Sequence, residues 1–305
     1  DGREGPAKPE RLCVKGRYGF DYVHHPDRLT KPLIRRKDAP KTMELLQPKD
    51  WQKVFREASW EEALDFAADG FSKIWDENGP DALAAFGCAK GSNEEAYLLQ
   101  KLVRTGFGTN NIDHCTRLCH ASSVSALLEG IGSGAVSNPF TDVTDADVIF
   151  LIGANPIGNH PVAATFMKNA VKAGKKLILL DPRRTALSRH ATYDLQFLPD
   201  TDVALLNSLM HVIIEEKLCD EKYITEHTTD FEKLKANVAD YSPEKVAPIC
   251  GIPEETLREV ARTFATAESA IILWGMGISQ HIHGTDNSRC LIALSLMTGQ
   301  IGRPG

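Results

Sequence analysis

The sequence predicts an α/β protein whose main domain is a doubly wound, mostly parallel sheet of the Rossmann-like kind. Short apolar runs of strand length recur in its second half, amphipathic stretches of helix length separate them, and turns with glycine or aspartate follow the runs. Strands that alternate with helices favour a parallel sheet, because parallel neighbours need a crossover connection. A chain of 305 residues, 42% hydrophobic and 25% charged, can bury a core of this size.

We expect a smaller α/β lobe and an irregular N-terminal segment ahead of this sheet. Residues 1–50 are rich in proline, lysine and arginine and show little periodicity, which predicts an irregular segment. Residues 51–113 are predicted to form a partial α/β domain, and residues 114–305 the domain that contains the main sheet. The chain starts at Asp1 without an initiator methionine and stops in the turn residues 302–305, which indicates a piece of a longer polypeptide.

The second part is predicted to contain a helix, a strand and a second helix. Ser59 and Glu62 form a capping box, which begins a helix that extends to about residue 75. Residues 81–87 have the length and apolar content of a short buried strand, and residues 93–107 have the periodicity of an amphipathic helix.

The third part has the regular alternation that predicts the main sheet. Its strands end in turns with glycine, aspartate or proline, and the helices between them begin with proline or aspartate, which are favoured in the first turn. The predicted strands are residues 147–153, 176–180, 195–198 and 270–274, and the predicted helices are residues 122–131, 161–173, 202–218 and 253–267.

Bulk properties exclude several classes of partner. The net charge of -6, without blocks of like charge, gives no support for a nucleic-acid partner. No apolar run reaches the roughly 18 residues that a membrane span needs. The seven cysteines lack the spacing of a secreted disulfide framework, so we expect a reducing, cytoplasmic environment.

Cys119 is followed directly by His120, and this pair is the most informative feature of the sequence. A thiolate is a soft ligand for a heavy transition metal, and an imidazole can take or give a proton near neutral pH. The pair lies in a predicted turn just before a helix, where backbone N–H groups favour a thiolate. An isolated cysteine of this kind is more often a small buried hydrophobe, so the surrounding sequence has to decide.

Three consecutive strand ends have the chemistry of a nucleotide site. The loop at residues 153–156 precedes a helix, where phosphate is favoured, although it lacks the G-x-G-x-x-G pattern of an NAD site. At the next strand end Asp181 could bond a ribose hydroxyl and Arg183 a phosphate. At the third, Asp202 could accept hydrogen bonds from a guanine edge. Each loop alone is compatible with ordinary turn and cap chemistry, but three in succession favour a ligand.

Five motifs occur in the order found in the molybdopterin-guanine-dinucleotide oxidoreductases, and the chain resembles that family over almost its whole length. They are Cys119-His120, Gly153-Ala154-Asn155-Pro156, Asp181-Pro182-Arg183, Asp200-Thr201-Asp202 and Trp274-Gly275-Met276-Gly277 with Gln280. The resemblance is greatest to the catalytic (alpha) subunit of soluble, NAD-dependent formate dehydrogenases. Related nitrate reductases usually place methionine after the cysteine, whereas formate dehydrogenases place histidine, as His120 does here.

The resemblance implies a bis-molybdopterin guanine dinucleotide cofactor with molybdenum or tungsten, and formate oxidation to carbon dioxide. Cys119 would be the protein ligand of the metal and His120 would hold the proton, whether the hydrogen leaves formate as hydride or as a proton. The residues expected to contact the cofactor are Lys90, Cys115, Gly153, Asn155, Pro156, Asp181, Pro182, Arg183, Asp200, Asp202, Gly275, Met276 and Gln280.

The resemblance also implies an electron path. Cys13 would be the last of four cysteine ligands of a [4Fe–4S] cluster, and Lys15 would lie between cluster and pterin. The other three cysteines would precede this chain, and the arginine that orients formate would follow Gly305. Electrons would pass through iron–sulfur clusters to a partner flavin subunit that reduces NAD.

Three alternatives stay open on the sequence. The chain could belong to a nitrate reductase or another pterin oxidoreductase, or to an electron-conducting scaffold subunit that has lost the metal. Cys115 and Cys119 have C-x3-C spacing, which suits zinc, but no second Cys/His pair at finger spacing follows.

Overall fold

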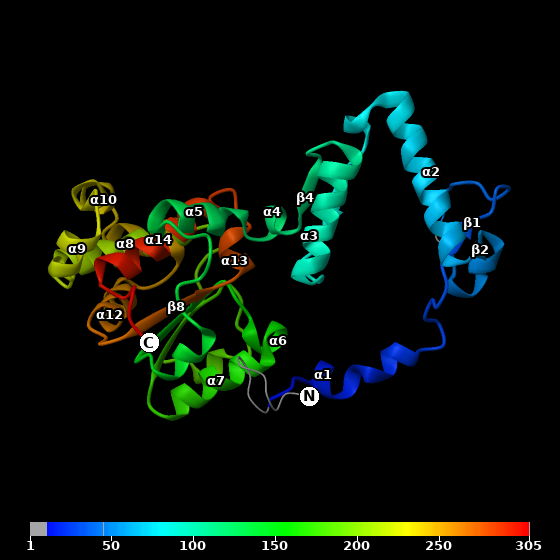
Figure 1. Cartoon of the computed structure of the whole chain (residues 1–305). Coiled ribbons are helices and arrows are strands. Elements are labelled where there is room, and N and C mark those ends of the chain that lie inside the picture. The colour runs from blue at the N-terminus through cyan, green and yellow to red at the C-terminus, as the bar shows by residue number, and fades with distance from the viewer. Residues whose placement is uncertain (1–10, 45, 305) are drawn as a thin grey trace. The chain divides into compact units, whose positions relative to one another are not determined.

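The computed structural model describes residues 11–44 and 46–304, and the chain divides into two compact units (Figure 1). The smaller unit contains residues 14–117. The larger unit contains residues 118–304 together with the stretch 11–13. Each unit is described by itself below.

The smaller unit combines helices with two separate pairs of short strands. β1 pairs antiparallel with β2, and β3 pairs parallel with β4. The Ser59 hydroxyl accepts a hydrogen bond from the Glu62 N–H at 3.1 Å and so begins α2 where the capping box predicts. In chain order its elements are α1 (Val14–Tyr18), a 3₁₀-helix (Gly19–His24), β1 (Leu33–Arg35), a 3₁₀-helix (Pro48–Lys53), β2 (Phe55–Glu57), α2 (Trp60–Asn78), a 3₁₀-helix (Pro80–Ala82), β3 (Ala85–Gly87), α3 (Asn93–Lys101), a π-helical segment (Leu102–Phe107) and β4 (Ile112–His114).

Three expectations for this unit need correction. The N-terminal segment was expected to be irregular, but it contains α1 and β1. The strand expected over residues 81–87 begins only at Ala85, because Pro80–Ala82 form a 3₁₀ turn. The helix expected over residues 93–107 changes from α to π geometry after Lys101.

The larger unit is built around a four-stranded parallel sheet in the order β7-β6-β5-β8. In chain order its elements are α4 (Thr116–Cys119, which begins in the smaller unit), α5 (Ala121–Ile131), a 3₁₀-helix (Phe140–Thr144), β5 (Val148–Ile152), α6 (Pro156–Asn159), α7 (Pro161–Lys172), β6 (Lys176–Leu180), a 3₁₀-helix (Ser188–His190), β7 (Tyr193–Leu195), α8 (Asp202–Glu215), α9 (Glu221–His227), α10 (Phe231–Val238), α11 (Pro243–Cys250), α12 (Glu254–Ala265), β8 (Ala270–Trp274), α13 (Met276–Ser279) and α14 (Gly284–Met297).

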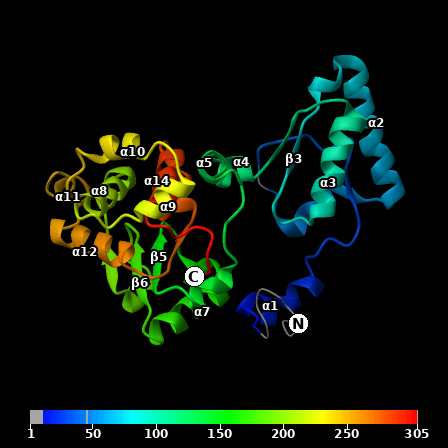
Figure 2. The ribbon, with the colours of Figure 1, turned by 60° about the vertical axis from the view of Figure 1, so that its left-hand side comes forward.

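Both faces of this sheet are buried beneath helices, as Figure 2 shows for β5 and β6 between α7 and α12. Successive side chains of β5 alternate between two hydrophobic clusters. Phe150 packs into the cluster formed with α8, α11, α12 and α14, where it meets Phe264 edge-on at 5.6 Å. Ile149 and Leu151 pack against α7 on the other face. The predicted α/β class and parallel sheet are confirmed, and the finer doubly wound, Rossmann-like description stays a prediction.

The third predicted strand lies in the wrong place. β7 covers Tyr193–Leu195 rather than residues 195–198, because β6 ends at Leu180, which pairs with Leu195. Beyond that point the chain has no strand partner, and the Leu198 N–H instead donates to the Cys250 carbonyl at 2.8 Å. None of the helices in the described ranges is long and apolar enough to cross a membrane.

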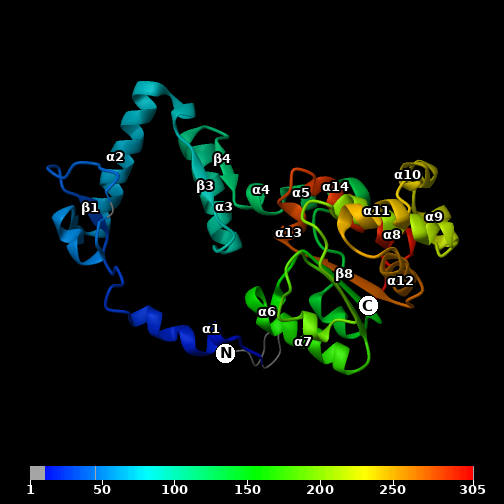
Figure 3. The ribbon, with the colours of Figure 1, turned by 180° about the vertical axis from the view of Figure 1, so that it is seen from behind.

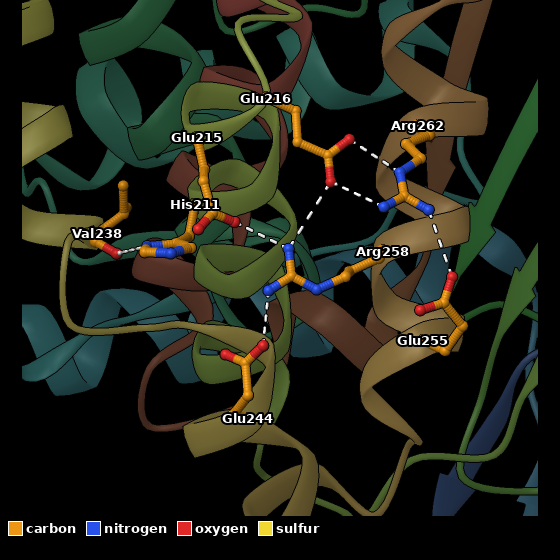
Figure 4. A network of polar contacts seen from close by, with 8 residues as sticks. All are labelled: His211, Glu215, Glu216, Val238, Glu244, Glu255, Arg258 and Arg262. Carbon is orange, nitrogen blue, oxygen red and sulfur yellow. Dashed lines mark hydrogen bonds and ion pairs between the residues drawn. The ribbon is translucent and has the colours of Figure 1, made fainter.

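An ion-pair network joins α8, α11 and α12 on the surface of the larger unit (Figure 4). Arg258 donates to Glu215 at 2.8 Å and to Glu244 at 2.6 Å. Arg262 holds both carboxylate oxygens of Glu216, at 2.8 and 3.0 Å. The hydrogen bond from Arg258 lowers the pKa of Glu244 to about 2. Networks that share an arginine are worth more than isolated surface pairs.

Replacing Arg258 by methionine is therefore expected to lower the free energy of unfolding at neutral pH by about 1 kcal/mol, after allowance for screening by solvent. Because the pKa of Glu244 is depressed in the folded chain, its contribution is present above the ordinary value of 4.5 and is lost as the pH falls towards 2. Thermal melts of wild type and variant should therefore converge in acid. The matched control is Lys73→Ala, which removes an exposed ion pair with Glu77 at 3.9 Å and should leave the Tm unchanged. A Tm for Arg258→Met equal to that of wild type at pH 7 would contradict the role of the network.

Candidate functional site

The loops that follow β5 and β8 pack backbone against backbone. The Gly277 N–H donates to the Gly153 carbonyl at 3.0 Å. A Cβ on Gly153, whose φ is +59°, would lie 2.8 Å from the Gly277 carbonyl carbon, and a Cβ on Gly275 would lie 2.8 Å from the Gly153 oxygen. Glycine is therefore required at these positions for the contact between the two loops. Whether Gly153 and Gly275 also contact a cofactor stays a prediction.

The loop after β5 leads into a short helix that the sequence did not predict. Asn155 caps α6, with its side-chain oxygen accepting from the Gly158 N–H at 3.4 Å, and Pro156 occupies the first turn. α7 begins at Pro161, as predicted. The structure thus explains Asn155 and Pro156 by helix capping, and a phosphate contact remains a prediction.

The strand end after β6 leaves a cation exposed beside a buried carboxylate. Asp181 is buried, and its Oδ1 accepts from the Arg183 N–H at 2.8 Å across Pro182. The guanidinium of Arg183 is 81% exposed, with its Nε 4.0 Å from that oxygen. This guanidinium is therefore accessible to an anionic group, as the sequence predicts for a phosphate contact.

Asp202, the first residue of α8, is a buried carboxylate. It is 3% exposed, and the resulting desolvation raises its pKa above the ordinary value. Asp200 lies just before it with a φ of +66° and contacts His281, whose Nδ1 is 3.2 Å from the carboxylate oxygen. No local pattern in the sequence could pair His281 with a residue 81 positions away.

Cys119 and His120 lie between two helices rather than in a simple turn. Cys119 is the last residue of the short helix α4, which corrects the predicted turn. His120 is the N-cap residue of α5, where its carbonyl accepts from the Val124 N–H at 2.9 Å. Both side chains are half-buried. The predicted position just before a helix is thus confirmed for His120.

Residues that follow β8 hold His120 and its neighbour Leu118 by hydrogen bonds. Figure 3 shows α13 beside α5 and α14, and these three helices contact one another. The Gln280 side-chain amide donates to the Leu118 carbonyl at 3.1 Å, and His120 Nδ1 lies 3.0 Å from the Ser279 hydroxyl. The predicted residues His120 and Gln280 are therefore brought together, while Met276 is about half exposed beside them.

Of the four remaining predicted residues, three belong to the smaller unit and Cys13 belongs to the larger one. Lys90 is exposed in the turn after β3, and Cys115 accepts from the Ala89 N–H at 3.3 Å, both in the smaller unit. Lys15 is exposed on α1, and Cys13 is half-buried just before that helix. Their relation to Cys119 stays a prediction.

Comparison with known proteins identifies the family. The model of the family described as molybdopterin oxidoreductase matches residues 28–305. The chain belongs to the molybdopterin oxidoreductases. Within this family it is 39% identical over 300 residues to the F420-dependent formate dehydrogenase 2 subunit alpha of Methanococcus maripaludis, covering 98% of this chain and 42% of that protein. It is 38% identical over 306 residues to formate dehydrogenase H of Escherichia coli, covering 99% of this chain and 41% of that protein.

A solved structure supports the same fold. The acetylene hydratase of Pelobacter acetylenicus superposes with a TM-score of 0.83 at 27% identity, covering 97% of this chain and 39% of that chain. This molybdopterin oxidoreductase chain therefore spans about two fifths of the length of the relatives it matches.

The side chains present fit a metal held mainly by an organic cofactor. Within the described ranges, no group of three or more His, Cys, Asp or Glu side chains is placed to hold a metal ion. Cys119 therefore offers a single soft thiolate, and the remaining ligands would have to come from the bound group. Asp202 contributes a buried carboxylate, which can accept hydrogen bonds, and Arg183 an exposed guanidinium, which can pair with an anion. Contact of either with a guanine nucleotide stays a prediction.

Proposed function

We propose that this chain is the part of a formate dehydrogenase catalytic subunit that holds the guanine-nucleotide pterin and supplies the protein ligand of the metal. The observation that supports this most directly is the half-buried Cys119 thiol beside His120, held by the loop that follows β8. Relatives at 38–39% identity over nearly the whole chain are named formate dehydrogenases.

Each residue of the pair has a distinct part in the proposed reaction. When bound, the molybdenum or tungsten centre accepts the two electrons released as formate becomes carbon dioxide. Cys119 ligates that metal through its sulfur. His120 takes the proton that the reaction releases, and general acid–base help of this kind is worth roughly 10²–10⁴-fold in rate.

The nucleotide part of the cofactor is proposed to bind at the strand ends. Asp202 accepts hydrogen bonds from the guanine edge, Asp181 from a ribose hydroxyl, and Arg183 pairs with phosphate. We further propose that Lys90, Cys115, Met276 and Gln280 line the pterin side. Lys90 and Cys115 follow β3 and β4, Met276 begins α13 and Gln280 follows it.

The electron path reaches beyond this chain. We propose that Cys13 is one ligand of a [4Fe–4S] cluster and that Lys15 lies between cluster and pterin, with a flavin subunit passing the electrons to NAD in the cytoplasm. One relative is named for F420 rather than for NAD, so an assay of NAD reduction by the full-length enzyme tests this acceptor.

Replacing Asp202 by asparagine separates an effect on nucleotide binding from an effect on the stability of the fold. Because burial raises the pKa of Asp202, its ionised form opposes folding at any pH above the raised value, and this cost disappears below the ordinary value of 3.8. Asp202→Asn should therefore raise the Tm of nucleotide-free protein by a few degrees at pH 7 but not in acid. The same variant should retain less guanine nucleotide. The matched control is Asp240→Asn, at a side chain 92% exposed, and a variant of Asp202 with full nucleotide content would contradict the assignment.

The activity itself is tested on the full-length protein with a dye acceptor. Formate oxidation without nitrate reduction supports the proposal, and nitrate reduction without formate oxidation favours the nitrate-reductase alternative. Absence of both activities, together with absence of molybdenum and tungsten by elemental analysis, favours the metal-free scaffold.

A further inference from the structure

A chain of hydroxyl groups runs from His120 into the core of the larger unit. His120 Nδ1 lies 3.0 Å from Ser279 Oγ, and Ser279 Oγ lies 2.6 Å from Ser123 Oγ. Ser123 Oγ is in turn 3.1 Å from Ser288 Oγ. The three serines are at most 5% exposed, so their hydroxyl groups need partners within the protein.

Two groups with fixed hydrogen-bonding roles contact this chain, one at Ser123 and one at Ser288. The Trp274 indole N–H donates to Ser123 Oγ at 2.8 Å, and an indole nitrogen can only donate. The Ser288 hydroxyl donates to the Gly284 carbonyl at 2.9 Å, and a carbonyl can only accept. The indole N–H remains a donor and the backbone carbonyl remains an acceptor in every arrangement of the serine hydroxyls.

The Gly284 carbonyl determines the direction of each hydrogen bond from Ser288 back to His120, because a serine hydroxyl has one hydrogen. The Trp274 donor occupies a lone pair of Ser123 and is compatible with that direction. Ser288 uses its hydrogen on Gly284, so Ser123 must donate to Ser288. Ser123 has then used its own hydrogen, so Ser279 must donate to Ser123. Ser279 can now only accept from His120. This is the one assignment in which all five contacts are hydrogen bonds.

We propose that Ser279, Ser123 and Ser288 are positioning residues that, through the bond from Ser288 to the Gly284 carbonyl, fix His120 as the tautomer with its hydrogen on Nδ1. The neutral ring then has its lone pair on Nε2, which has no hydrogen-bond partner among the described residues. Nε2 is therefore the atom that takes the proton in the proposed formate reaction, while Nδ1 keeps its hydrogen towards Ser279. The inference rests on the proposed function for the identity of the reaction, but not for the tautomer.

The position of the ring is fixed together with its tautomer. The Ser122 hydroxyl donates to the Ser279 carbonyl at 2.6 Å, and the Asn287 side chain donates to the Ile278 carbonyl at 3.1 Å. The short helix α13, which carries Ser279, is thus held from α5 and from α14. Hydrogen-bond partners that orient a metal-ligating histidine are typically worth 10–100-fold in affinity or activity, and we expect an effect of the same order at His120, beside the proposed ligand.

The direct test is the tautomer itself, read by solid-state ¹⁵N NMR on full-length protein labelled at histidine. The His120 signals are identified by their loss in His120→Gln. We expect a protonated Nδ1 and an unprotonated Nε2 in the wild type. A spectrum with the hydrogen on Nε2 would overturn the proposal, whether or not any variant folds.

The sharpest variant is Ser288→Ala, which touches neither the histidine nor Ser279. Removing this acceptor frees the Ser123 hydrogen to turn towards Ser279, and Ser279 can then donate to His120 Nδ1. The hydrogen on the ring should move to Nε2, and kcat for formate should fall about 10-fold with KM unchanged. An unchanged tautomer in folded Ser288→Ala would refute the hydroxyl chain.

Further variants separate the effect of hydrogen-bond direction from that of side-chain packing. Ser279→Ala removes the acceptor and should lower kcat by about 10–100-fold, while Ser279→Thr keeps the hydroxyl and should restore most of it. Ser125→Ala, on the same helix as Ser123 but with its hydroxyl on the surface towards Glu129, should change neither tautomer nor kcat. Should the wild type lack formate activity yet show the predicted tautomer, the proposed function fails and the hydroxyl chain stands.

Discussion

Replacing Cys119 by serine in the full-length protein is expected to abolish formate oxidation, by at least about 10³-fold or roughly 4 kcal/mol in the activation free energy. A hydroxyl is a harder and more weakly coordinating group than a thiolate, so the metal loses its one proposed protein ligand. The half-buried side chain changes by a single atom, so the fold should persist.

The measurement for Cys119→Ser is dye-linked formate oxidation with metal content and circular dichroism on the same sample. Cys88→Ser is the matched control, because that cysteine is exposed and has no proposed part in the site. Turnover close to that of wild type in Cys119→Ser would show that the sulfur is not the ligand.

Gly284→Ala is expected to cause the largest loss of stability. The added Cβ would lie 2.2 Å from the Ser279 carbonyl oxygen and 2.9 Å from the Ser122 hydroxyl, so α14 and the loop after β8 would have to separate. Overpacking of this kind typically lowers the free energy of unfolding by 1–3 kcal/mol. Here we expect about 3 kcal/mol, because the hydrogen bond from Ser122 to the Ser279 carbonyl would break as well.

Denaturant or thermal unfolding of the full-length protein tests this expectation. Gly70→Ala in α2 is the matched control: a Cβ there meets no atom within 4 Å, and alanine is favoured over glycine in a helix interior by up to about 1 kcal/mol. A Tm for Gly284→Ala equal to that of wild type would mean that the close approach of α14 to the loop is not required.

The sequence predicts the centre of the sheet well and its periphery poorly. β5, β6 and β8 are five-residue apolar runs bounded by turn residues, and they were predicted at or within one residue of their observed ends. β7 was misplaced because its end is set by pairing with β6, which a local pattern does not contain. α14 was missed because it is buried on most sides and its serine, asparagine and cysteine residues give no amphipathic period.

In the candidate site, too, some residues could be predicted from the sequence and others could not. Residues at strand ends, such as Asp181 and Asp202, follow from the alternation of strands and helices, because parallel strands end at one edge. The Ser123, Ser279 and Ser288 cluster could not be predicted, since Ser123 lies more than 150 positions from the other two and serine alone is no signal. His281 beside Asp200 was missed for the same reason.

The most direct test of the whole account is the content of purified full-length protein. We expect one molybdenum or tungsten atom and two guanine nucleotides for each polypeptide, with the metal bonded to sulfur of Cys119 as judged by X-ray absorption on wild type against Cys119→Ser. Folded, full-length protein that contains neither molybdenum or tungsten nor guanine nucleotide would contradict the proposal that this chain holds the metal-bearing pterin.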